Sequence, residues 1–151
     1  MRVQEHHDLA NDFLFRPGIL DPFAAGRADP IDLLEAGRKV FNDLKARGVH
    51  DALIVCGDGL NGLRNAVESV FPHADVQLCV VHHIRNVTKF VSWKDRKSLC
   101  SAMRAIYTAP TIEAAELALD RFAQSWEARY PMSVAAWRNH WNDLTTFFRY
   151  P

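Results

Sequence analysis

The sequence lacks any excess of charge of one sign. Its 151 residues hold 18 Lys and Arg against 18 Asp and Glu, so the formal net charge is zero and the pI is near 7.1. Net charge alone therefore predicts no polyanionic partner. Apolar residues are not scarce, since 48% of the chain is hydrophobic. Collagen-like, low-complexity and wholly disordered classes are excluded, and the length fits one globular domain.

Cysteine is scarce. Cys56, Cys79 and Cys100 are too few and too scattered for a disulfide framework, which predicts a reducing, cytoplasmic compartment. The first residues lack the basic-then-apolar order of a signal peptide, and no apolar run approaches the ~18 residues of a membrane span. We expect neither export nor membrane insertion.

The neutral total hides two unlike segments. Residues 1–35 hold three basic and seven acidic residues, whereas residues 85–104 hold six basic residues and a single acidic one, Asp95. A local basic patch therefore exists within a neutral chain.

Proline and glycine punctuate the start of the chain, so we expect an irregular leader over residues 1–30. Apolar residues at helical spacing then predict a helix over 31–47. Two short apolar runs, 52–56 and 76–81, read as buried strands on either side of a helix over 60–70. This order predicts an α/β layer with a mostly parallel sheet.

Beyond His82 the pattern is helical to the end of the chain. The clearest stripe, from Ile112 to Trp126, predicts a helix with Thr111 as its N-cap. Trp126, Trp137 and Trp141 lie on helical stripes and are expected in the core.

Asp58 lies between two glycines directly after the first predicted strand, where α/β proteins place functional groups. It is a candidate catalytic carboxylate or metal ligand, or alternatively a turn residue that caps the helix starting near Leu60. A nucleotide-binding loop is disfavoured, because no acidic ribose partner follows about 20 residues later.

Cys79 and His82 form a C-x-x-H sequence at the end of the second predicted strand. A structural zinc site needs four ligands, and neither Cys56 nor Cys100 has paired spacing. A buried cysteine and a helix-capping histidine are therefore favoured over zinc. His82 is expected near Asp58, because the two residues end adjacent parallel strands.

The basic patch has Phe90 and Trp93 interleaved with its cations. These side chains could hold a phosphate backbone and stack a base, or they could form an ordinary solvated helix face. The candidate DNA-binding residues are Arg85, Lys89, Lys94, Arg96 and Lys97.

From about Lys39 to Pro151 the chain resembles the middle of a Mutator-type transposase of bacterial insertion sequences, a DDE recombinase. The resemblance is carried by blocks in the right order, among them 43–49, 58–62, 76–86, 91–97, 105–111, 137–141 and 144–148.

The resemblance implies a partial RNase H-like core over 31–91 and an all-α insertion region over 92–151. In the complete parent, three carboxylates hold two Mg²⁺ or Mn²⁺ ions that act on terminal inverted repeats and target DNA. It makes Asp58 the second carboxylate, a catalytic metal ligand, and Cys79 and His82 the family's C/D-x-x-H pair beside the active site.

The first and third carboxylates of the family have no counterpart in this sequence. We therefore expect a transposase fragment without strand-cutting activity alone, cytoplasmic and nucleoid-associated when bound to DNA. Alternatives are a non-catalytic DNA-binding or interfering remnant and a small Cys/His metal or redox protein. Uncovered strand edges also predict poor solubility or homo-oligomers.

Overall fold

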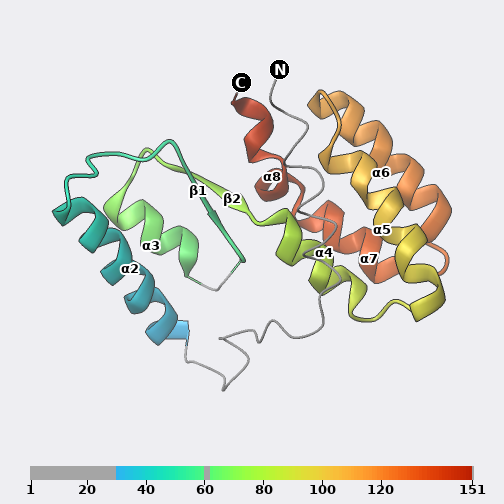
Figure 1. Cartoon of the computed structure of the whole chain (residues 1–151), viewed down its shortest axis with the longest axis horizontal. Helices are drawn as coiled ribbons and strands as arrows, with labels where there is room; N and C mark the ends of the chain where they lie inside the picture. The colour runs from blue at the N-terminus through green and yellow to red at the C-terminus, as the bar shows by residue number, and fades with distance from the viewer. Residues whose placement is uncertain (1–29, 60–61, 151) are drawn as a thin grey trace.

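A computed structural model describes residues 30–59 and 62–150 (Figure 1). The expected irregular leader lies outside these ranges, except for Pro30. Within them the fold is mostly helical, with two parallel strands in one sheet. The predicted parallel pair is thus confirmed. No helix in the described ranges is long and apolar enough to cross a membrane.

Helix α2 (Pro30–Ala46) and helix α3 (Leu63–Val70) pack together beside the sheet (Figure 1). The helix predicted over 31–47 is confirmed. Their shared core holds Phe41, Ala66, Val67, Val70, Phe71 and Ala74. Phe71 ends α3 as its C-cap, and its ring meets that of Phe41 edge-on at 6.2 Å.

The sheet pairs β1 (Ile54–Gly57) with β2 (Asp75–Leu78), with Val55 opposite Val76. The strand predicted over 76–81 is wrong at its carboxyl end, because β2 stops at Leu78. Cys79 N donates to the carbonyl of Gly57, the last residue of β1, at 2.6 Å. Beyond that bond β1 offers no further partner, so from Val80 the apolar run continues as helix.

The second half is a helical cluster made of α4 (Val80–Thr88), α5 (Trp93–Tyr107), α6 (Ile112–Trp126) and α7 (Pro131–Asn139). The bounds predicted for α6 are confirmed, and the Thr111 hydroxyl accepts from Ala114 N at 3.2 Å as the predicted N-cap. Trp137 is 1% exposed at the centre of this cluster. Its Nε1 donates to Met103 Sδ at 3.1 Å.

The end of the chain returns to the sheet through α8 (Trp141–Leu144) and the 3₁₀ helix η1 (Thr146–Arg149). Gln77 of β2 is buried there. Its Nε2 donates to Leu144 O at 3.0 Å, and its Oε1 accepts from Phe147 N at 2.9 Å. These bonds join the helical cluster to the strands.

Candidate functional site

Asp58 lies at the carboxyl end of β1, where the sequence placed it. Glycine on each side suits this turn: the positive φ of Gly59 favours glycine, and both backbones pass close to leucine side chains. Gly59 has φ +78°, and a Cβ there would lie 2.6 Å from Leu78 Cδ1; a Cβ on Gly57 would lie 2.1 Å from Leu63 Cδ2. The loop therefore passes close against β2 and α3 with the Asp58 side chain half-exposed.

Asp58 does not cap α3. That helix begins at Leu63, later than predicted, with Gly62 in a left-handed conformation as N-cap and no side-chain cap hydrogen bond. Asp58 is therefore not the N-cap residue of α3.

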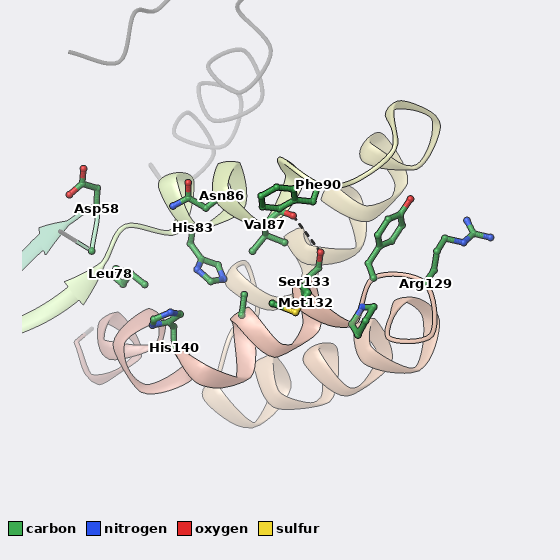
Figure 2. Close-up of a pocket in the computed structure, with 14 residues that line it drawn as sticks. Asp58, Leu78, His83, Asn86, Val87, Phe90, Arg129, Met132, Ser133 and His140 are labelled. Carbon is green, nitrogen blue, oxygen red and sulfur yellow. Dashed lines mark hydrogen bonds between the residues drawn. The ribbon is translucent and has the colours of Figure 1, made fainter. Parts of the chain in front are cut away.

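A cavity of about 550 Å³ begins at Asp58 and runs between α4 and α7 (Figure 2). In the figure Asp58 and Arg129 lie at opposite ends, with His83 and His140 between them. The lining residues include Asp58, Gly59, Leu78, His83, Asn86, Val87, Phe90, Arg129, Tyr130, Met132, Ser133 and His140.

His83, which the sequence reasoning missed, lines this cavity together with His140. It is 6% exposed, and its buried Nε2 has no hydrogen-bond partner among the residues that the structure describes. The ring meets Trp137 edge-on at 4.9 Å and lies 5.9 Å from the ring of His140. Burial, with a smaller contribution from His140, lowers the pKa of His83 from 6.5 to about 4. His83 is therefore neutral at pH 7.

His82, the predicted catalytic histidine, is exposed on α4 and does not line the cavity. Asp58 therefore lines the cavity with His83 and not with His82. The available signal was the helical period: His83 shares the buried face of α4 with Ile84 and Val87.

The cysteines make no metal centre in the described ranges. No three His, Cys, Asp or Glu side chains there lie close enough to hold a metal ion. All three cysteines are free, and Cys79 is the N-cap residue of α4. Burial, and then Cys79 beside it, raises the pKa of the Cys56 thiol. The zinc alternative gains no support from this part of the chain.

The predicted DNA-binding residues lie along α4 and the start of α5. Lys89, Lys94 and Lys97 are exposed and form no ion pair within the described residues. Arg96 places its guanidinium 5.9 Å from the ring centre of Trp93, and Arg85 is half-buried in the last turn of α4. We call the segment that carries these five cations, from Arg85 at the end of α4 to Lys97 on α5, the basic face.

The two aromatic side chains of this face are both open to solvent. Phe90 is 88% exposed and Trp93 is 80% exposed. Both rings are therefore available to stack on a flat ligand.

Asp95, the acidic residue within the basic segment, is held against the start of α7. It accepts from Tyr130 Oη at 2.8 Å, from Arg129 at 3.0 Å and from Ser92 Oγ at 3.1 Å. These bonds, the one from Tyr130 first, hold the pKa of Asp95 below its ordinary value. Because Asp95 pairs with Arg129, it does not neutralise the three exposed lysines.

Comparison with known proteins shows the family to which the chain belongs. The family described as "Transposase, Mutator family" matches residues 34–151. The chain is 50% identical over 113 residues to a protein of Corynebacterium diphtheriae named "Probable transposase for insertion sequence element", covering 74% of this chain and 33% of that protein. It is 44% identical over 114 residues to the transposase for insertion sequence element ISRM3 of Rhizobium meliloti, covering 75% of this chain and 28% of that protein. The chain spans about a third of the length of these curated relatives. It belongs to the Mutator family of transposases.

Proposed function

We propose that this chain carries one carboxylate-bearing segment and one DNA-contacting segment of a DDE transposase for an insertion sequence. The observation that carries the proposal is the position of Asp58. It directly follows a parallel strand and lines a cavity, within the family match. The carboxyl edge of a parallel sheet is where such folds place functional groups.

The described residues do not fit a two-metal centre by themselves. Each divalent ion requires several oxygen ligands, and phosphoryl transfer of this kind uses two ions about 4 Å apart. Asp58 offers one carboxylate, and no further acidic side chain in the described ranges joins it in a metal-binding group. We therefore propose that the 151 residues do not cut DNA alone and that the missing carboxylates belong to other sequence.

Cleavage assays test the catalytic part of the proposal. The purified chain is incubated with DNA bearing terminal inverted repeats and with Mg²⁺ or Mn²⁺, and strand breaks are followed on a sequencing gel. The expected result is no cleavage above the protein-free control. Metal-dependent cleavage that disappears in Asp58→Asn would contradict the proposal, because one carboxylate would then suffice.

A second candidate function is non-catalytic DNA binding, as in an interfering remnant. The observation that favours it is the basic face, whose three lysines remain unpaired within the described residues while Asp95 is held by Arg129 and Tyr130. This function needs no metal. It uses the same DNA-binding surface as the proposed transposase function.

A further inference from the structure

The cavity beside Asp58 is mainly apolar, with a few polar atoms at fixed places. Its volume of about 550 Å³ lies within the range of small-molecule sites, roughly 300–1,000 Å³. Leu78, Val87 and Met132 supply apolar wall. Asp58 and Arg129 stand at opposite ends (Figure 2), and Arg129 is already paired with Asp95 at 3.0 Å. The middle of the cavity therefore suits an uncharged group.

The polar atoms in that middle section belong to neutral donors and acceptors. His83 points from α4 towards α7, with His140 beside it (Figure 2). It is 6% exposed, and its buried Nε2 has no partner among the described residues. A buried nitrogen without a partner is uncommon in folded proteins, and a ligand atom that reached it would supply the missing hydrogen bond. Asn86 and Ser133 add an amide and a hydroxyl to the lining.

An open aromatic ring borders the cavity. Phe90 is among the lining residues although its side chain is 88% exposed. The preceding residue, Lys89, is exposed and belongs to the basic face. An aromatic plane, neutral hydrogen-bonding groups and a neighbouring cation are the combination that proteins use for a nucleobase and its phosphate.

We infer that this cavity takes a single unpaired nucleobase of a DNA strand whose backbone runs along the basic face. The inference rests on the proposed function, because it requires DNA at the basic face. Phe90 would stack on the base, while Asn86, Ser133 and the free nitrogen of His83 meet its edge.

The test compares the affinity of the full chain for two duplexes of identical length that share the same strand with a single 2-aminopurine. In one duplex the opposite position is abasic, so the 2-aminopurine is unpaired, and in the other it is paired with thymine. We expect about tenfold tighter binding of the unpaired form, with a change of 2-aminopurine fluorescence on binding. Phe90→Ala, at an exposed position where the fold is not at risk, is expected to bring the two affinities within about twofold. Asn86→Ala is expected to lower the preference several-fold.

Trp93→Ala is the matched control. It removes an equally exposed aromatic ring from the basic face but not from the cavity. It is expected to weaken both duplexes by the same factor, which leaves the preference unchanged. Equal affinity of the natural chain for both duplexes, or a preference that survives Phe90→Ala, overturns the inference while leaving DNA binding intact. A chain that binds neither duplex contradicts both this inference and the DNA-binding part of the proposed function.

Discussion

Single residues decide what the cavity can do, and the sequence located them only in part. Asp58 could be singled out because strand, glycine and turn signals converge on it. His82 was preferred over His83 because the C-x-x-H spacing points to it, yet His83 lines the cavity. The apolar stripe of Ile84 and Val87 places His83, and not His82, on the buried face of α4.

Stability against acid should depend on His83. Its pKa is about 4 when folded and 6.5 when unfolded. Above pH 6.5 both states are neutral. Between pH 6.5 and 4 the unfolded state binds the proton more tightly, so stability falls as the pH falls. From pH 7 to pH 5 the loss attributable to this group is about 2 kcal/mol.

Urea denaturation at the two pH values measures this loss. In His83→Gln, which cannot titrate, the fall in unfolding free energy should be smaller by that amount. His82→Gln removes the exposed neighbour and should behave like the natural chain. Identical pH profiles for the natural chain and His83→Gln would contradict a buried, neutral His83.

Elements with a strong helical period were predictable, and those set by tertiary pairing were not. The stripe from Ile112 to Trp126 gave the bounds of α6, because one face alone is apolar. The run from Val76 to Val81 is apolar except for Gln77, and it shows neither a strand period nor a helical one. Its division into β2 and α4 depends on where β1 ends, at Gly57, and that lies in another segment.

The N-cap of α6 provides a test at this scale. Thr111→Ala removes the hydroxyl that accepts from Ala114 N. We expect a loss of about 1 kcal/mol in unfolding free energy. Thr111→Ser keeps the hydroxyl and should retain most of that stability. A loss that is equal in both variants would show that the methyl group, and not the cap, matters.

The bond between β2 and the end of the chain is tested at Gln77. Gln77→Leu keeps the side-chain size but leaves Leu144 O and Phe147 N without their partner. Because both backbone groups lose a hydrogen bond in a buried setting, we expect the free energy of unfolding to fall by about 3 kcal/mol. Gln124→Leu, at an exposed site on α6, should change stability by less than about 0.5 kcal/mol. Thermal or urea unfolding of the two variants measures the difference.

The whole molecule has two apolar clusters joined by the sheet and by the bonds of Gln77. The sequence indicated an α/β part followed by a helical part. It did not indicate that α4 belongs to the helical cluster, where Ile84 and Val87 are buried. That packing arises from contacts with α5 and α7 that no local pattern encodes.

Exposed apolar surface predicts self-association. Leu53, directly before β1, is 75% exposed, and β1 pairs on one side only within the described ranges. We expect weight-average mass to rise with concentration in sedimentation experiments. Leu53→Lys should reduce this rise, whereas Leu117→Lys, on α6 at 58% exposure, should not. A monomer at every concentration would contradict the prediction.

DNA affinity as a function of salt is the most direct test of the central claim that a basic face hidden in a neutral chain binds DNA. Between about 50 and about 200 mM salt, the affinity of the natural chain should fall steeply. Replacing Lys89, Lys94 and Lys97 together by Gln should flatten the log–log slope by about 3. Replacing Arg38, Lys39 and Arg121 by Gln changes net charge equally but should leave the slope unchanged. A flat salt dependence, or equal slopes for the two triple variants, would contradict the claim.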